Sequence, residues 1–231
     1  MRFSFVTLFQ NIIEGYFSDS ILARAIQSQK IFIDFFNPRD YTTDKHARVD
    51  APMVGGGAGM LMSPQPLFDT FDDIISTSPN AHIVFLSPVG KPFTQNDAKR
   101  LAQKEHIVLV SGRYEGIDER VIEKYADEMF SIGDYILTGG ELASMVVCDA
   151  VSRNVQEVLG NSESLAIESY EEALLEAPSF TKPLNYKNYS VILEYSKGNH
   201  SRIADLKKRL SESKTKYFRP DLYKIVKQKG K

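Results

Sequence analysis

Apolar positions in the first 160 residues fall into short runs that alternate with amphipathic stretches. Residues 82–88 (HIVFLSP) and 106–112 (HIVLVSG) are apolar without the alternation of a half-exposed strand. Such runs indicate strands that are covered on both faces. Residues 93–104 and 117–126 follow these runs and have helical spacing. This alternation predicts an α/β protein with a parallel sheet.

The same patterns predict the remaining elements of this part of the chain: strands at 2–8, 31–36, 128–133 and 135–137, and helices at 20–29, 64–76 and 141–159. Ser20 is a candidate N-cap of the first helix. A long loop is predicted at 37–62, and it contains GGGAG at 55–59. Loops of this length without structure are usually functional or disordered.

Three predicted strand ends carry glycine together with hydroxyl or carboxylate side chains: residues 86–92 (LSPVGKP), 111–120 (SGRYEGIDER) and 131–141 (SIGDYILTGGE). In open α/β sheets, ligands bind at the carboxyl ends of the strands. One such turn alone would be an ordinary connection in which glycine serves geometry. Three in succession favour a ligand site where the backbone approaches closely.

The absence of phosphate-binding motifs disfavours a ligand that is held through its phosphates. No G-x-x-x-x-G-K-[ST] motif occurs, and GGGAGM at 55–60 has no lysine and follows no predicted strand. A ligand held by backbone amides without a phosphate cradle would be adenosine-like. S-adenosylmethionine fits that description, although these residues alone do not single it out.

Several carboxylates are expected near this cleft: Glu115, Asp118, Glu119, Asp134 and Glu141. Asp118 and Glu119 open a helix, where acidic side chains favour the helix dipole, so Glu115 in the turn itself is the better functional candidate. Arg153, late on a helix, is more typical of a surface position when judged from the residues alone. The four histidines have no metal-ligand spacing, so no metal site is predicted.

Charge is distributed unevenly along the chain. Residues 182–231 hold 14 basic and 4 acidic side chains, a net +10, whereas the first 181 residues hold 14 basic and 26 acidic ones, a net −12. The C-terminal part is therefore expected to meet a polyanion. We predict three regions: an α/β domain at 1–159, a flexible acidic linker at 160–172, and a basic helical domain at 173–231.

The cellular compartment is indicated by the single cysteine and by the lack of a predicted signal peptide or membrane span. The single cysteine, Cys148, cannot form an internal disulfide, which favours a reducing compartment. No signal peptide is predicted, and no apolar run approaches the roughly 18 residues of a membrane span. A cytoplasmic protein without a membrane partner is expected.

Three motifs in this order, GGGAGMLM at 55–62, GRYEGIDER at 112–120 and SIGDYILTGGEL at 131–142, together with GNH…FRPDL at 198–222, give the chain a family resemblance. It resembles the bacterial tRNA (guanine-N1)-methyltransferases, knotted methyltransferases of the SPOUT class, over nearly its whole length. The resemblance implies a parallel α/β sheet with a deep trefoil knot, followed by a small all-helical domain that binds tRNA.

For activity, the resemblance implies methylation of N1 of the guanosine on the 3′ side of the tRNA anticodon. This modification supports the reading frame. S-adenosylmethionine is the implied methyl donor, with a magnesium ion assisting. The implied assembly is a homodimer whose active sites are shared between subunits.

Residue by residue, the resemblance places the cofactor loops at Phe85, Leu86, Ser87, Pro88, Gly112, Tyr114, Ser131, Ile132, Gly133, Asp134, Tyr135, Ile136, Leu137, Gly139 and Gly140. It makes Glu168 the general base and Arg153 the support of the target base, with Glu115 as a further catalytic candidate. Basic and aromatic residues near the C-terminus would contact RNA, and the candidates are His200, Lys207, Lys208, Arg209, Lys216 and Arg219.

At the base position the chain departs from the family pattern. Glu168-Ser169-Tyr170 stands where the family has Asp-Ser-Phe or Asp-Ser-Tyr, so the carboxylate is kept but lengthened by one methylene. The same chemistry would require the backbone to sit further back. Other departures remove no reactive group: Val54, Ala58, Phe85 and Ala143.

Two alternatives to a methyltransferase remain open. The first is an RNA-binding protein that has lost catalysis, for which the change at Glu168 is the only support. The second is an α/β nucleotide enzyme of another class, which the missing phosphate loops disfavour.

Overall fold

The chain divides into two compact units, residues 1–160 and 161–231. The computed structural model describes residues 1–160, 168–171 and 173–229. Of the predicted linker at 160–172, residues 161–167 and 172 lie outside the described residues.

A five-stranded sheet forms the centre of the first unit. Its strands are β1 (Arg2–Val6), β2 (Phe32–Phe36), β5 (His82–Pro92), β6 (His106–Ser111) and β7 (Glu128–Ser131), in the order β2-β1-β6-β5-β7. All neighbouring strands are parallel. The sheet that the apolar runs predict is therefore confirmed.

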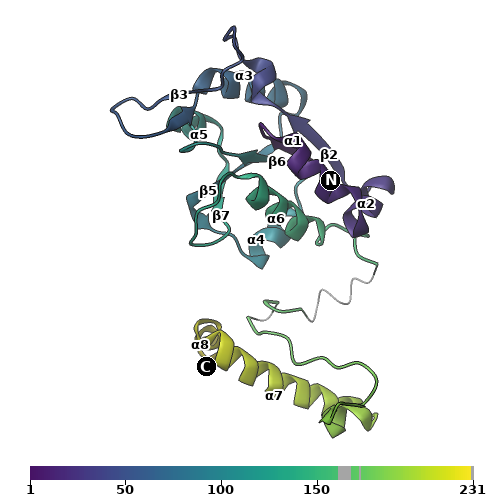
Figure 1. Cartoon of the computed structure of the whole chain (residues 1–231). Helices are drawn as coiled ribbons and strands as arrows, with labels where there is room; N and C mark the ends of the chain where they lie inside the picture. Colours follow the sequence, from purple (N-terminus) through teal and green to yellow (C-terminus); the bar gives the residue numbers. More distant parts are fainter. Residues whose placement is uncertain (161–167, 172, 230–231) are drawn as a thin grey trace. The chain divides into compact units, whose positions relative to one another are not determined.

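Helices cover both faces of this sheet (Figure 1). The helical elements on one face are α1 (Gln10–Glu14), η1 (Gly15–Ser18), α2 (Ser20–Gln27), α4 (Gln95–Leu101) and α6 (Glu141–Ser152). On the other face lie α3 (Pro64–Thr77) and α5 (Glu119–Tyr125). Successive residues of β5 serve the two cores, because Val84 packs with the first group and Phe85 with the second. Burying one such side chain stabilises the fold by roughly 1.5–3 kcal/mol.

The interior of β5 bulges beside the ligand edge. Leu86 and Lys91 both pair with Phe130 of β7, so residues 87–90 loop out between the two pairings. A Cβ at Gly90 would lie 2.6 Å from the Phe130 backbone, so only glycine allows this return. The strand consequently runs beyond the predicted 82–88 and presents a loop at the carboxyl edge.

Polar residues anchor the far end of β5 to its neighbours. The Glu128 carboxylate accepts from Arg100 at 2.7 and 2.8 Å, from His82 Nε2 at 2.8 Å, and lies 2.9 Å from Lys91 Nζ. Burial would raise the pKa of Glu128, but the hydrogen bonds from Arg100, His82 and Lys91 outweigh it and lower the pKa to about 2. The network ties β5 to β7 and α4.

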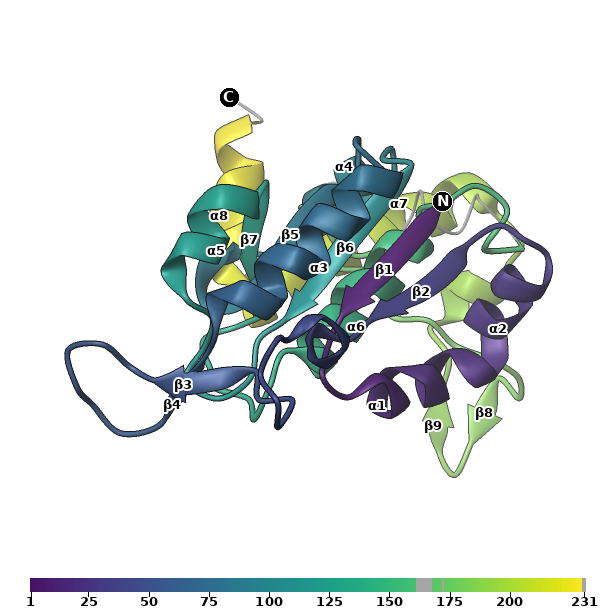
Figure 2. The same cartoon turned by 90° about the horizontal axis from the view of Figure 1, so that it is seen from above.

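The predicted loop at 37–62 contains regular structure. It forms η2 (Pro38–Tyr41) and an antiparallel pair of β3 (Asp50–Pro52) and β4 (Met60–Met62), with the glycine-rich segment at its tip. This hairpin projects from the body of the unit (Figure 2). Its strands are only three residues long, which is why the sequence pattern does not reveal them.

Three other predictions about local structure are wrong. The N-cap of α2 is Asp19, whose carboxylate accepts from the Ser20 amide, and Ser20 is the first helical residue. Residues 135–137 form no strand, because the Tyr135 ring folds back over Gly133. The helix predicted at 141–159 ends at Ser152, where the Asn154 side chain donates to the Ala150 carbonyl at 2.8 Å and competes with further helix.

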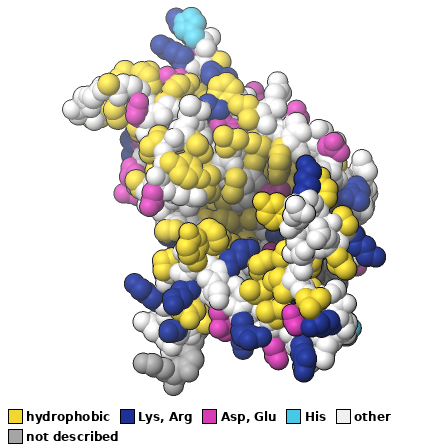
Figure 3. Space-filling model, turned by 60° about the horizontal axis from the view of Figure 1, so that its bottom comes forward, with side chains coloured by type: hydrophobic (Ala, Val, Ile, Leu, Met, Phe, Trp, Pro, Cys, Tyr) yellow, Lys and Arg dark blue, Asp and Glu magenta, His cyan; other side chains and the backbone are white. Residues whose placement is uncertain are grey.

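The second unit carries α7 (His200–Phe218) and α8 (Pro220–Lys229), preceded by η4 (Leu193–Ser196). It is not all-helical as predicted, because β8 (Asn185–Tyr186) and β9 (Tyr189–Ser190) form an antiparallel hairpin. Lys187 and Asn188 in its turn both have positive φ, as a two-residue hairpin turn requires. Lysine and arginine side chains gather around the C-terminal helices, between exposed hydrophobic ones (Figure 3).

Candidate functional site

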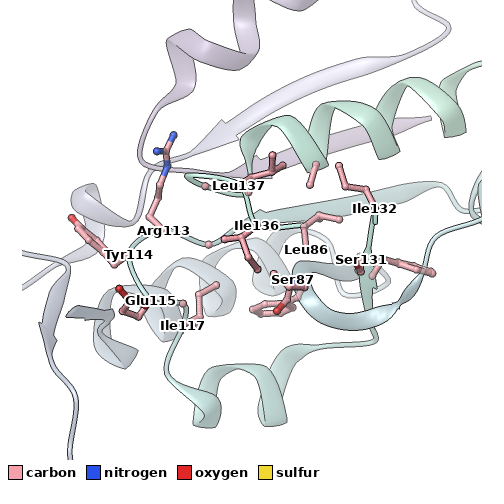
Figure 4. A pocket seen from close by; sticks show the side chains of 18 of the residues that line it. Leu86, Ser87, Arg113, Tyr114, Glu115, Ile117, Ser131, Ile132, Ile136 and Leu137 are labelled. Atoms are coloured by element: carbon pink, nitrogen blue, oxygen red, sulfur yellow. The ribbon is translucent and has the colours of Figure 1, made fainter. Parts of the chain in front are cut away.

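A cavity of about 290 Å³ opens at the carboxyl edge of the sheet. The loop within β5 and the turns after β6 and β7 all line it, as does the segment that leads into α6 (Figure 4). The predicted convergence of three strand ends is therefore observed. Ile117, Ile136 and Leu86 lie around the same space, which is more apolar than polar in its lining.

Of the residues predicted to hold a cofactor, every one except Asp134 lines this cavity. Asp134 is exposed and lies outside the lining, since the chain turns at Gly133. The sequence reasoning missed six lining residues: Arg113, Gly116, Ile117, Ile122, Phe130 and Ala143. Arg113 had a signal, because it stands in the GRYEGIDER motif directly after Gly112.

Glycines let two segments of backbone meet at the cavity wall. The Gly140 amide donates to the Gly112 carbonyl at 2.9 Å, and a Cβ on Gly140 would lie 2.7 Å from Ser111 Cα. Its neighbour Gly139 leaves similar room for the Arg113 guanidinium, at 2.4 Å from the position of a Cβ. A larger residue at Gly139 or Gly140 would break these contacts unless the backbone of the cavity wall shifts.

A buried ion pair fixes this meeting point. Arg113 Nε donates to Glu141 Oε1 at 3.0 Å, and Arg113 Nη2 lies 2.8 Å from Glu141 Oε2. Glu141 also accepts from the Thr7 hydroxyl at 2.9 Å, and its side chain is 2% exposed. The guanidinium points out of the cavity (Figure 4), lies 4.3 Å from the centre of the Phe9 ring and donates to the Thr138 carbonyl at 3.3 Å. Glu141 is therefore structural rather than a free carboxylate in the cleft.

The turn at 113–116 joins the glycine-rich hairpin to the cavity. Tyr114 has φ +59°, a left-handed conformation that a bulky residue adopts only when its surroundings hold it. The Glu115 amide donates to the Met60 carbonyl at 3.0 Å. Gly59, with φ +91°, packs so closely on the Glu115 side chain that a Cβ would lie 2.5 Å from Cγ. Glu115 is exposed at the cavity rim, positioned by the hairpin.

The two other predicted catalytic residues belong to different units. Arg153 is the C-cap of α6 in the first unit and is half-buried. Glu168 is half-buried in the second unit, where its carbonyl accepts from the Glu171 amide at 3.4 Å. The fold of either unit alone does not bring these two side chains together.

Most of the predicted RNA contacts are exposed side chains of α7: His200, Lys207, Lys208, Arg209 and Lys216. Arg219 differs from them. It caps the end of α7, is half-buried, and donates to both carboxylate oxygens of Asp221 at 2.6 and 3.0 Å. Its charge is thereby already paired within the protein.

The described ranges 1–160, 168–171 and 173–229 contain neither a cluster of metal ligands nor a helix suited to span a membrane. No group of three or more His, Cys, Asp or Glu side chains in these ranges is arranged to hold a metal ion. In the same ranges, no helix combines the length and apolarity that a membrane crossing needs.

Fold and cavity together define a class: an α/β protein whose ligand site lies at the carboxyl ends of adjacent parallel strands and is walled by close-lying backbone. The chain lacks the phosphate loops of nucleotide-binding members of that class.

Comparison with known proteins narrows the class to one family. The family model described as tRNA (Guanine-1)-methyltransferase TrmD matches residues 1–225, so the chain belongs to this family. A protein of Sulfurovum sp. (strain NBC37-1) named tRNA (guanine-N(1)-)-methyltransferase is 75% identical over 97% of this chain and 99% of its own length. Proteins of the same name from Sulfurimonas denitrificans and Campylobacter curvus are 66% and 58% identical, each over at least 96% of both chains.

Proposed function

We propose that the protein methylates N1 of the guanosine on the 3′ side of the anticodon in tRNA, using S-adenosylmethionine, and so supports the reading frame. The observation that carries this is the cavity walled by the loop within β5 and the turns after β6 and β7, in a chain that matches the family from residue 1 to 225. A tRNA substrate also implies a cytoplasmic location.

The cavity suits S-adenosylmethionine in chemistry. Its volume of about 290 Å³ lies just below the range of roughly 300–1,000 Å³ that is typical of small-molecule sites. Apolar side chains, among them Ile117, Ile136 and Leu137, can cover an adenine ring, and glycine-rich backbone leaves amides and carbonyls within reach of its polar edge. When bound, S-adenosylmethionine supplies a methyl group on a sulfonium, which is electrophilic without further activation.

Glu168 is the proposed general base. Guanine N1 carries a proton, and its lone pair is a poor nucleophile until that proton leaves. A positioned carboxylate that takes the proton contributes typically ~10²–10⁴ in rate. Glutamate retains the carboxylate of the family's aspartate, so the added methylene changes reach and not chemistry.

Arg153 is proposed to stabilise the base as it loses its proton. Negative charge then collects on guanine O6, and a guanidinium offers a charged hydrogen bond there. Glu115, exposed at the rim beside the glycine-rich hairpin, is the proposed contact to the exocyclic edge of the same base.

The second unit is proposed to bind the tRNA. Residues 182–231 have a net charge of +10, and the exposed cations of α7 can neutralise phosphates. Exposed tyrosines on the β8–β9 hairpin, Tyr186 and Tyr189, add aromatic surface of the kind that stacks on unpaired bases.

A homodimer is proposed from an exposed apolar face on the first unit. Leu142 and Val146 of α6 are about half exposed, as are Phe9, Ile12 and Tyr16 beside them in the α1 region. Tyr16 donates to Asp149 of α6, and this hydrogen bond, with burial, raises the pKa of Tyr16 to about 12. Apolar surface of this extent is characteristic of an interface. Active sites shared between the two subunits would unite the cavity of one with residues of the other.

We also propose that residues 132–152 pass through a trefoil knot. The return of Gly140 onto Gly112 and the packing of α6 against β6 and α4 support it. For Mg²⁺ the described residues offer no ligand cluster, and no step of the proposal is routed through a metal.

The decisive experiment is methyl transfer from radiolabelled S-adenosylmethionine to unmodified tRNA, with the methylated position mapped. We expect one m1G next to the anticodon, and no product when that guanosine is replaced by adenosine. Glu168→Gln should lose at least about 100-fold in single-turnover rate while binding both substrates. Arg153→Ala should lose a comparable factor. Cofactor binding without methyl transfer by the wild type would instead indicate an RNA-binding protein that has lost catalysis.

A further inference from the structure

Hydrogen bonds connect described residues that follow Glu168, from positions on either side of 172. The Tyr170 amide donates to the Leu174 carbonyl at 2.8 Å, and the Glu176 amide donates to the Ser169 hydroxyl at 3.1 Å. Tyr170 has φ +79°, a left-handed conformation that needs such support. The backbone beside the proposed base is therefore connected by hydrogen bonds to other residues of the second unit.

Two hydroxyls of α7 form hydrogen bonds with the backbone of this segment at Leu175. Thr215 Oγ1 accepts from the Leu175 amide at 2.8 Å, and the Ser211 hydroxyl donates to the Leu175 carbonyl at 2.5 Å. The two lie four residues apart, hence on one face of the helix. Thr215 is fully buried and also donates to the Ser211 carbonyl at 2.7 Å, so both hydrogen-bonding capacities of its hydroxyl are used.

A third contact lies one turn further along. The Arg219 guanidinium, held by Asp221, lies 6.0 Å from the centre of the Tyr170 ring, at the outer limit of a cation–π contact. Ser211, Thr215 and Arg219 thus form a row, spaced by four residues, that faces the Glu168 segment. The exposed Lys207 and Lys208 stand on the same helix.

We propose that Ser211 and Thr215 are positioning residues that fix the Glu168 carboxylate relative to tRNA held on α7. This rests on the proposed function, in which α7 contacts phosphates and Glu168 removes the N1 proton. One helix then carries the RNA contacts and also holds the segment that bears the general base, so Glu168 meets the guanine in a fixed register with the bound RNA. Misplacing a catalytic group by about 1 Å can cost on the order of 100-fold in rate.

The sharpest variant is Thr215→Val, which keeps the shape of the side chain and removes the acceptor of the Leu175 amide. We expect its single-turnover methyl transfer at saturating tRNA and S-adenosylmethionine to fall about 10–100-fold. Its dissociation constants for both substrates should stay within about twofold of wild type, because no phosphate or cofactor contact is touched. Ser211→Ala should act in the same direction, and Thr215→Ser, which keeps the hydroxyl, should restore most of the rate.

Ser213→Ala is the matched control, since Ser213 is exposed on the same helix and should leave rate and affinity unchanged. The proposal is overturned if Thr215→Val keeps the wild-type rate, or if rate and tRNA affinity fall by equal factors. Should Thr215→Val unfold in a thermal melt monitored by circular dichroism, the Ser211→Ala and Thr215→Ser pair decides by the same criteria. If the wild type does not methylate tRNA, or if Glu168→Gln keeps the full rate of methyl transfer, the proposed function itself is contradicted.

Discussion

The Arg113 guanidinium and the Glu141 carboxylate join the end of β6 to the first residue of α6 through nitrogen–oxygen contacts of 2.8 and 3.0 Å. The pair closes one wall of the cavity, because the 138–140 segment lies against the same guanidinium. A charge that is 2% exposed is stable only while its partner remains. The turn after β6 and the segment 138–141 therefore both depend on one ion pair.

Arg113→Ala should destabilise the fold by about 3 kcal/mol, because it leaves Glu141 buried and uncompensated. It should also weaken S-adenosylmethionine binding by at least about tenfold through loss of the 138–140 wall. Urea denaturation and isothermal titration calorimetry measure the two effects. Arg120→Ala, which removes an exposed arginine from the same motif, should change neither. Tight cofactor binding by the Arg113 variant would contradict the role given to the pair.

Gly140→Ala should distort the cavity, since the new methyl group would lie 2.7 Å from Ser111 Cα and 2.9 Å from the Gly112 nitrogen. Overpacking of this kind costs about 1–3 kcal/mol and here falls on the ligand wall. We expect loss of cofactor binding in the same titration. Gly15→Ala is the control, because no atom lies within 4 Å of its added Cβ and its φ is −58°. Equal behaviour of the two variants would refute the close-approach argument.

Stability should fall in acid because of Glu128. Its pKa is depressed in the folded protein to about 2, so the unfolded chain binds the proton more readily. The stabilisation is present above about pH 4.5 and is lost as pH falls toward 2, roughly 3 kcal/mol in all. Thermal melts between pH 6 and pH 2.5 measure it. Glu128→Gln should melt lower at pH 6 and show a flatter acid limb. If the melting temperature of the variant falls with pH as steeply as that of the wild type, other carboxylates cause the loss of stability in acid.

Leu142→Glu should prevent dimerisation, because it places a charge at the middle of the apolar face formed by α6 and the α1 region. Sedimentation velocity at micromolar concentration should give a dimer for the wild type and a monomer for the variant. Val54→Glu, at an exposed apolar position in the glycine-rich hairpin, is the control and should remain dimeric. A monomeric wild type would remove the basis for the shared active site.

Replacing Lys207 and Lys208 together by alanine should weaken tRNA binding uniformly and lower the slope of log K against log salt by about 1 to 2. Filter binding at several salt concentrations gives both quantities. Cofactor affinity should not change. Lys104→Ala, an exposed lysine of the first unit, is the control. A slope equal to that of the wild type would show that these side chains make no phosphate contact.

The parallel sheet and the three ligand-facing turns could be predicted because their signals are local. IVFL and IVLV are apolar on both faces, and a glycine occurs within four residues after each of these runs. The short elements could not be predicted. Strands β3 and β4 are too brief for an alternating pattern to appear. Residues 135–137 have the composition of a strand, but in the structure the Tyr135 ring folds over Gly133.

The ion pair of Arg113 and Glu141 could not be predicted from the sequence for a different reason. Its partners stand 28 residues apart, and a third member, Thr7, lies more than 130 residues from Glu141. Only the chain's return to Gly112 makes them neighbours, and no spacing rule encodes that return. The grip of Thr215 on Leu175, across 40 residues, belongs to the same kind of information.

Five of the residues that line the cavity are glycines, at positions 112, 116, 133, 139 and 140. A mutation alters side chains and leaves the amide and carbonyl groups of the main chain in place. Few single substitutions would therefore weaken an inhibitor that draws its affinity from these main-chain groups. At Gly139 and Gly140, moreover, any added side chain collides with Arg113 or Ser111, so a resistant variant would also damage a wall of the proposed cofactor site.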